Sequence, residues 1–411
     1  MKPIKLNLKA VLILCSLFFF LKGNSQQLEI FINEALSNNP EIQKFELQYS
    51  IVSEKVNEVH TVPNTEFGVG YFVSEPETRT GAQRFKVSVK QMIPWFGSIT
   101  VREGYVSSLA DAKYEDITIA KRKLMASVSQ SYYDLYAYKA KQKVFAENIE
   151  LLKTYETLAL TSVEVGKASV VDVLRLQMRQ NEIQQLLDVS MQQFIAEQTT
   201  FNKLLNRDKD IKVNVISELL IPSESFEVNS GNLELHPELL KFDKLYYSVE
   251  QSELLNQKES NPMIGFGLDY INVEKRPNLD FSDNGKDVIM PMVSISIPIF
   301  NNKYKSKTKQ NELQQQEILS RKQERFNTLE TLLDKAVNNR ISARITYATQ
   351  TKNLKQAKDA EGILIKSYET GTINFNDVLD IQELQLKFEI NKVESVKTYY
   401  MQTTIINYLT N

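Results

Sequence analysis

The sequence predicts an α+β membrane protein that combines long α-helical coiled-coil hairpins with four transmembrane β-strands per chain. Three features of the 411 residues lead to this fold class: two internal repeats, four short segments that alternate apolar and polar residues, and two long stretches without proline. Repeats are decisive because each copy must adopt the same local plan.

Residues 1–25 have the features of a cleaved signal peptide. Lys2 and Lys5 give the chain a positive start. An apolar run from Ala10 to Leu21 follows, which is too short to span a bilayer, and small residues lie at Gly23–Ser25. We expect the mature chain to begin near Gln26, the alternative being an uncleaved anchor. The sole cysteine, Cys15, follows a leucine where a lipoprotein signal needs a small residue, so we expect no acylation and no disulfide.

The mature chain repeats one plan twice, which divides it into residues 26–221 and 222–411. The offset between matching residues grows only from 197 to 205 along the chain. The matching segments are Asn39–Ile42 with His236–Leu239, Phe67–Tyr71 with Phe266–Tyr270, Ile93–Phe96 with Ile297–Phe300, and Gly166–Gln177 with Gly371–Gln382. Each repeat therefore predicts a helix, two strands and a long helical hairpin.

Helical periodicity covers residues 28–60, and Pro63 ends that helix. Four segments then change to a period of two, which indicates strands with one apolar and one polar or glycine-lined face. They lie near residues 65–73, 84–92, 263–272 and 289–298. Each has the length that a tilted strand needs to cross a bilayer.

Two very long helices follow the strands. Proline is absent from 95–221 and from 299–411. Residues 98–161 alone would form a helix of roughly 95 Å, a length that favours coiled-coil packing. We expect Gly166 and Gly371 to break these helices, so that the chain returns as a second helix.

Four strands cannot enclose a lumen, and an open sheet edge in lipid leaves backbone groups unpaired. We therefore expect an oligomer: two chains would give about 8 strands and three about 12. We expect Trp95, Phe96 and Phe300, at the strand ends, to lie at the interface of a barrel with the membrane. A soluble four-stranded sandwich capped by helices is the alternative.

The composition argues against several classes of protein. The 49 basic and 51 acidic residues nearly cancel, which gives no basic surface for nucleic acid. The two histidines, His60 and His236, lie far apart, and no catalytic or phosphate-binding motif occurs. We expect no enzymatic activity, no cofactor and no transition-metal site.

Taken together, the Asn-Pro-Glu and His-Pro-Glu starts of the two halves, the four strands, the two Ile-Pro-x-Phe junctions and the paired Gly-x5-Asp-Val-Leu segments resemble the outer-membrane efflux protein family of TolC-like exit ducts. The resemblance covers nearly all of the mature chain. It implies a homotrimer in outer-membrane lipid, with a 12-strand β-barrel and a 12-helix periplasmic α-barrel. It also implies two partners, a periplasmic adaptor (membrane fusion) protein and an inner-membrane transporter.

The resemblance also implies a gate at the periplasmic tip. The family narrows its aperture with acidic residues that match Asp377 and Asp380, and a carboxylate ring of this kind attracts cations. In the family, contacts between the inner and outer helix pairs hold the tip closed, and the positions that match these contacts here include Tyr368 and Asp172. The family's arginine and threonine of this latch are replaced by Ile373 and Val171.

Arg175, one turn after Asp172, is a candidate for the missing cation, or it pairs with its own neighbours. Asp172 and Asp377 could equally be solvated residues or helix caps.

The cargo is left open. Drugs, metal ions, or proteins of a type I secretion system all fit a passive conduit, and Gln91–Gly97 is similar to family members of heavy-metal pumps. Rival interpretations of the whole chain are a periplasmic adaptor and a coiled-coil binding or scaffold protein. Neither of these interpretations explains the duplicated strands of membrane length.

Overall fold

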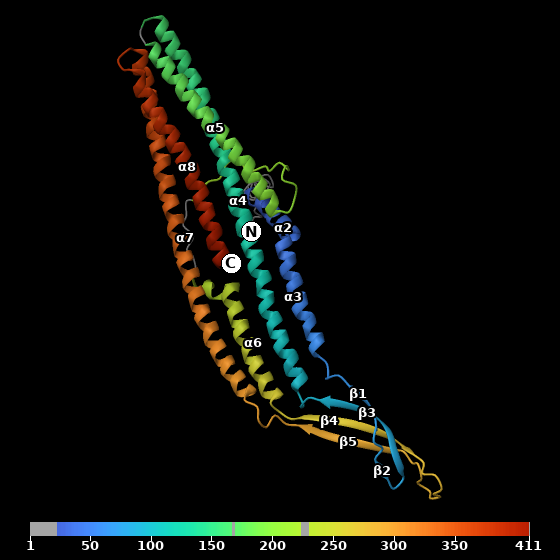
Figure 1. Ribbon diagram of the computed structural model, residues 1–411. Coiled ribbons are helices and arrows are strands. Elements are labelled where there is room, and N and C mark those ends of the chain that lie inside the picture. Colours follow the sequence, from blue (N-terminus) through green and yellow to red (C-terminus); the bar gives the residue numbers. More distant parts are fainter. Residues whose placement is uncertain (1–22, 167–168, 223–229, 411) are drawn as a thin grey trace, which may run out of the picture. The chain divides into compact units, whose positions relative to one another are not determined.

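The computed structural model describes residues 23–166, 169–222 and 230–410. Cys15 and most of the predicted signal peptide therefore lie outside the described residues. The chain forms two compact units, and each takes segments from both sequence repeats (Figure 1). The helical unit contains the residues up to Gln43, Thr118–His236 and those from Phe326 onwards. The sheet unit contains Lys44–Ile117 and Pro237–Arg325.

The helices follow the expected plan, with one additional break. Their bounds are α2 Gly23–Asn38, α3 Pro40–Val59, α4 Ser98–Glu164, α5 Val170–Leu204, α6 Pro237–Glu259, α7 Lys303–Glu369 and α8 Phe375–Thr410, with a short 3-10 helix, η1, at Ser230–Leu235. The single helix expected over 28–60 is divided at Asn39, because a residue before proline disfavours the α conformation. The Asn39 side chain instead accepts the Glu41 N–H at 2.8 Å and so caps α3.

Gly166 and Gly371 end the two 67-residue helices α4 and α7, as the sequence predicted. Their φ angles are +71° and +74°, a conformation that glycine adopts without a steric penalty. After α7, the Thr372 N–H donates to the Ser367 carbonyl at 3.0 Å and the Gly371 N–H to the Tyr368 carbonyl at 2.9 Å. These two bonds form a Schellman motif, which ends the helix with its last carbonyls satisfied.

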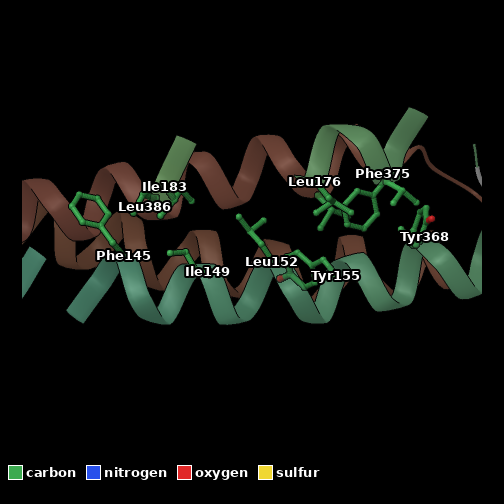
Figure 2. Packing of buried hydrophobic residues seen from close by; sticks show 12 residues of the cluster. Phe145, Ile149, Leu152, Tyr155, Leu176, Ile183, Tyr368, Phe375 and Leu386 are labelled. Atoms are coloured by element: carbon green, nitrogen blue, oxygen red, sulfur yellow. The ribbon is translucent and has the colours of Figure 1, made fainter. Parts of the chain in front are cut away.

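In the helical unit, α4 packs against α5, and α7 packs against α8 (Figure 1). All four helices contribute to one apolar core near the end where both turns lie (Figure 2). Its fully buried members include Leu152 on α4, Leu176 and Ile183 on α5, and Phe375 on α8. Burial of each such side chain stabilises the folded state by about 1.5–3 kcal/mol.

The sheet unit holds an antiparallel sheet with the strand order β1-β3-β4-β5. The strands are β1 Glu66–Tyr71, β3 Gly81–Ile93, β4 Met263–Glu274 and β5 Val288–Ser296. A further two-residue strand that the sequence analysis did not predict, β2 at Glu77–Thr78, pairs with β3.

The register places a continuous set of apolar side chains from all four strands on one face. Val89 lies between Phe67 on β1 and Leu268 on β4, and Phe266 lies beside Val293 on β5. On this face Val69 is 82% exposed and Val293 is 76% exposed. We call it the apolar face; an apolar face as exposed as this is unusual for a surface in contact with water.

The opposite face carries glycine and polar residues together with methionines, among them Met92, Met290 and Met292. Gly68 lies beside Ser88, and Lys86 forms an ion pair with the fully buried carboxylate of Asp269. Because a buried charge is costly without a partner, this ion pair ties β3 to β4 on the polar face.

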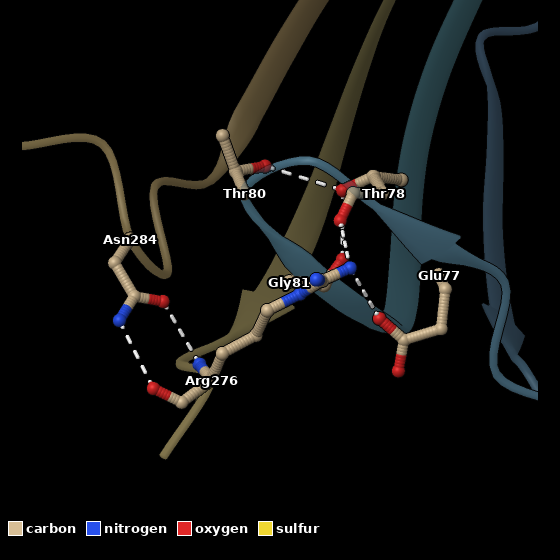
Figure 3. A network of polar contacts seen from close by, with 6 residues as sticks. All are labelled: Glu77, Thr78, Thr80, Gly81, Arg276 and Asn284. Carbon is tan, nitrogen blue, oxygen red and sulfur yellow. Dashed lines mark hydrogen bonds and ion pairs between the residues drawn. The ribbon is translucent and has the colours of Figure 1, made fainter. Parts of the chain in front are cut away.

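The two loops beyond the strands are bound to each other (Figure 3). Arg276 donates to the Glu77 carboxylate at 2.8 Å and to the Thr78 carbonyl at 2.6 Å. The Asn284 side chain accepts the Arg276 N–H at 2.8 Å and donates to the Arg276 carbonyl at 3.0 Å. The loop ends of the sheet are therefore ordered by charge-assisted bonds.

Candidate functional site: the tip of the two hairpins

The candidate gate residues lie on the first turns of α8. Asp377 and Asp380 are exposed, whereas Phe375 and Val378 on the opposite side of the helix are fully buried. Burial of that side therefore turns both carboxylates to the surface. Among the described residues, neither carboxylate forms an ion pair. The N-terminal end of α8 favours a negative charge at Asp377.

Asp172 caps its own helix. Its carboxylate accepts the Ser169 N–H at 3.4 Å, and the Ser169 hydroxyl accepts the Val171 N–H at 3.2 Å, so that a capping box begins α5. A helix cap is one of the three roles that the sequence left open for this carboxylate, beside a latch partner and a solvated residue.

Tyr368 is buried in an aromatic row at the end of α7. Its ring packs edge to face against Phe375, with 4.8 Å between the ring centroids. Phe375 packs in the same way against Tyr155, with 5.9 Å between the centroids (Figure 2). The Tyr368 hydroxyl is buried and has no hydrogen-bond partner within the described part of the chain. The expected hydrogen bond between Tyr368 and Asp172 is therefore not formed in this conformation, because each group is held elsewhere.

Arg175 connects the two hairpins. Its guanidinium donates to the Asn376 side chain, which lies on the first turn of α8 between the buried Phe375 and the exposed Asp377. Arg175 also lines an open groove of about 490 Å³ between α5 and α8. The other charged residues of this groove are Arg179 and Glu182 on α5, and Asp380 and Glu383 on α8. Arg175 thus bonds across to the second repeat, and its role as the missing cation of the latch stays a prediction.

Sequence reasoning missed one further link at the tip. The Tyr155 hydroxyl on α4 donates to the Glu361 carboxylate on α7. Burial raises the pKa of Tyr155, and the hydrogen bond to Glu361 raises it further, so the hydroxyl stays a donor. The only signal in the sequence was a tyrosine at a core position of a long helix, which by itself does not predict a partner on another helix.

The helix-break and strand-end residues occupy the expected local positions. Gly166 and Gly371 begin the two tip turns. Trp95 and Phe96 follow β3, and Phe300 follows β5; the side chains of Phe96 and Phe300 are 79% and 101% exposed. Across the described ranges, no group of three or more His, Cys, Asp or Glu residues could hold a metal ion. None of the described helices is both long enough and apolar enough to cross a membrane.

No protein-family model and no curated protein sequence matches the chain. Solved structures of outer-membrane proteins do match it. The channel-forming protein CusC is 13% identical over 94% of this chain and 92% of its own, with a TM-score of 0.77. The outer-membrane protein VceC of Vibrio cholerae is 14% identical over 94% of this chain and 96% of its own, with a TM-score of 0.72.

The outer-membrane channel MtrE of Neisseria gonorrhoeae, solved in its open state, is 14% identical over 93% of this chain and 88% of its own, with a TM-score of 0.72. The chain therefore has the fold of outer-membrane channel proteins. The predicted resemblance to the outer-membrane efflux protein family is confirmed at the level of the fold.

Proposed function

We propose that the chain is one subunit of a trimeric outer-membrane channel, a passive and non-enzymatic exit duct for an export pump. The observation that carries this proposal is the sheet. One face is apolar and highly exposed, and β1 and β5 are its edge strands. Lipid would cover the apolar face, and pairing of β1 with β5 of the next subunit would remove both edges.

Three subunits would close a 12-strand barrel with the polar face inside. Glycine and small polar residues on that face, such as Gly68 and Ser88, suit a lumen that passes cargo. The long helices would extend into the periplasm as a 12-helix tube, since their termini adjoin the strand ends at Trp95–Phe96 and Phe300.

The gate would lie at the tip of the hairpins. Three copies of Asp377 and Asp380 would bring six carboxylates around one aperture, which would bind cations and resist further narrowing. Arg175 and Asn376 would hold the closed tip across the two hairpins. Tyr368 and Asp172 stay candidates for a latch that forms in another conformation of the tip.

We propose that partner proteins drive the opening, since a passive conduit does not itself hydrolyse ATP. A periplasmic adaptor protein would bind near the tip and shift a closed–open equilibrium, and an inner-membrane transporter would supply the cargo. Drugs, metal ions and secreted proteins are all compatible with this duct, and no described contact selects one of them.

The test combines mass and conductance. The protein is extracted from outer membranes in mild detergent, its mass is measured without heating, and the same sample is added to planar bilayers. A trimer with small, cation-sensitive conductance supports the proposal. A water-soluble monomer without conductance would overturn it and favour an adaptor or a coiled-coil binding protein.

A further inference from the structure

Four methionines face the polar side of the sheet. They are Met92 on β3, Met263 on β4, and Met290 and Met292 on β5, four of the nine methionines in the chain. Among the described strand residues, the apolar face carries none, although methionine is apolar and lipid would accept it there. Contact with lipid therefore does not explain why methionine occurs in this sheet.

Two glycines of β4 form a floor between these methionines. Gly265 lies opposite Met92 on β3, and Gly267 lies opposite Met292 on β5. A Cβ atom at Gly265 would lie 2.5 Å from the Met92 sulfur, and one at Gly267 would lie 3.4 Å from the Met292 methyl group. The two side chains thus extend from opposite sides over glycines that are two residues, or about 7 Å, apart along the strand.

Met263 and Met290 extend this arrangement along the strands. Met263 is two residues before Gly265, which places it diagonally from Met92 at a separation of about 7–8 Å that long side chains can span. Met290 is two residues before Met292 on the same face of β5. Because methionine has three rotatable side-chain bonds, its sulfur can move to meet a ligand. We call the four methionines and the two glycines the methionine trough.

The trough is accessible from the polar face. Met290 is 39% exposed and Met292 is 37% exposed in the single chain. In the proposed trimer, β5 would pair with β1 of the next subunit, which carries Gly68 and Gly70 on the polar face. Glycines have no side chains that could cover the sulfurs. The edge of the trough therefore stays open after assembly.

The donors that the trough offers are thioethers. A thioether sulfur is uncharged and polarisable, so it favours soft monovalent ions such as Cu(I) and Ag(I) over hard ions such as Mg²⁺ and Ca²⁺. It has no proton to release when a metal binds, unlike cysteine, histidinium or a carboxylic acid. The scarcity of histidine and cysteine in the chain therefore does not bear on this kind of site.

We propose that the methionine trough is a luminal binding site for soft monovalent metal ions, in which two or three of its sulfurs coordinate one ion above the glycine floor. That the trough faces a lumen rests on the proposed channel function, whereas coordination by the sulfurs does not. The ion binds and leaves without a covalent or redox step. The site leaves the cargo of the duct open, because an ion that binds in the lumen need not be what the pump delivers.

Silver ion is the probe, since it stays monovalent in air. Calorimetry measures its binding to the detergent-purified protein in nitrate buffer at pH 7 and pH 5. All proteins carry Cys15→Ala, so that no thiol is present. The test variant is Met92→Leu with Met292→Leu, which keeps apolar side chains of similar size and removes two sulfurs. The matched control is Met178→Leu with Met191→Leu, two exposed methionines of α5.

We expect the parent and the control to bind silver equally at both pH values. The test variant should bind about tenfold more weakly or worse, since loss of groups that merely orient a metal ligand already costs this much. Equal binding in all three proteins would place the ion elsewhere and overturn the site. A parent that binds no silver would show that the methionines only fill the space above the glycines.

Planar bilayers in nitrate salts test the luminal position separately. Silver should lower the single-channel conductance of the parent and the control, and should have a much smaller effect on the test variant. A parent that conducts but binds no silver would refute the site and leave the channel function standing. A parent that binds silver but conducts nothing would refute the channel function, and with it the luminal position of the trough.

Discussion

The Tyr368 hydroxyl is buried without a hydrogen-bond partner among the described residues. Because phenylalanine keeps the ring and its contact with Phe375, Tyr368→Phe should leave stability unchanged or raise it by up to about 1 kcal/mol. We expect the resting leak of the channel to stay equal or fall. Thermal unfolding and single-channel recording measure the two effects. A rise in leak would show instead that the hydroxyl serves as a latch.

Asp377 and Asp380 are exposed and form no ion pair among the described residues, so we expect their charge to act where subunits of the proposed channel meet. Asp377→Asn with Asp380→Asn should weaken block by divalent cations, since a neutral ring no longer concentrates them. Conductance at increasing cation concentration measures this. Glu312→Gln, an exposed carboxylate on α7 within the sheet unit, is the control. Identical block in all three proteins would contradict the gate assignment.

The candidate residues differ in how far the sequence could predict their surroundings. Glycine breaks follow from local backbone sterics, so Gly166 and Gly371 were predictable from spacing alone. The partner of Arg175 is an asparagine 201 residues away in sequence, which only packing of the hairpins could bring close. That the Tyr368 hydroxyl has no hydrogen-bond partner among the described residues was equally unpredictable, because the absence of a hydrogen bond has no sequence pattern.

Between elements, two ion pairs, Lys141–Glu394 and Asp134–Lys397, make the contact of α4 with α8 sensitive to pH. Burial alone would raise the pKa of Glu394, but Lys141 and Lys397 lower it more, so its pKa lies below the ordinary value. Burial alone would lower the pKa of Lys397, but Glu394 and Asp134 raise it more, so its pKa lies above the ordinary value.

A carboxyl with a lowered pKa contributes stability above its unfolded pKa and loses it as the pH falls through the folded value. A lysine with a raised pKa contributes below its unfolded pKa and loses its contribution as the pH rises through the folded value. We therefore expect hydrogen-exchange protection of α8 around Glu394 to be greatest at pH values between the pKa of this carboxyl and that of Lys397. It should fall in acid below about pH 4.5.

The double variant Lys141→Met with Glu394→Leu is the control for this prediction. It replaces the Lys141–Glu394 ion pair by apolar side chains and should flatten the acid dependence of protection around Glu394, although Asp134 and Lys397 still face each other there. An unchanged acid dependence in this variant would show that other groups cause it.

At the scale of elements, periodicity predicted the ends of the strands and of the long helices to within a few residues. Each such element has one apolar side, and that side repeats along the sequence with a fixed period. It did not predict the break at Asn39, where the proline effect interrupts an otherwise continuous pattern. The two-residue strand β2 carries too few residues to show any period.

For the whole molecule, the apolar face of the sheet makes a directional prediction. Val293→Arg puts a charge on that face and should cost about 2–4 kcal/mol near the middle of a bilayer. Ser294→Arg puts the same charge on the polar face, one residue further along β5, and should be tolerated much better. Outer-membrane fractionation and unheated gel mobility of both variants measure assembly. Equal assembly would contradict a lipid-facing role for this face.

The sequence alone determined the repeat, the order of helices and strands, the two glycine breaks and the separation of apolar from polar strand faces. Each of these is encoded in local backbone sterics or in a period of two or of about 3.6 residues, which can be counted along the chain. Tertiary structure alone decided which polar side chains meet across the hairpins, from Arg175 with Asn376 to Tyr155 with Glu361. Those contacts join residues about two hundred positions apart, so they depend on the axial register of packed helices, and local patterns do not carry that information.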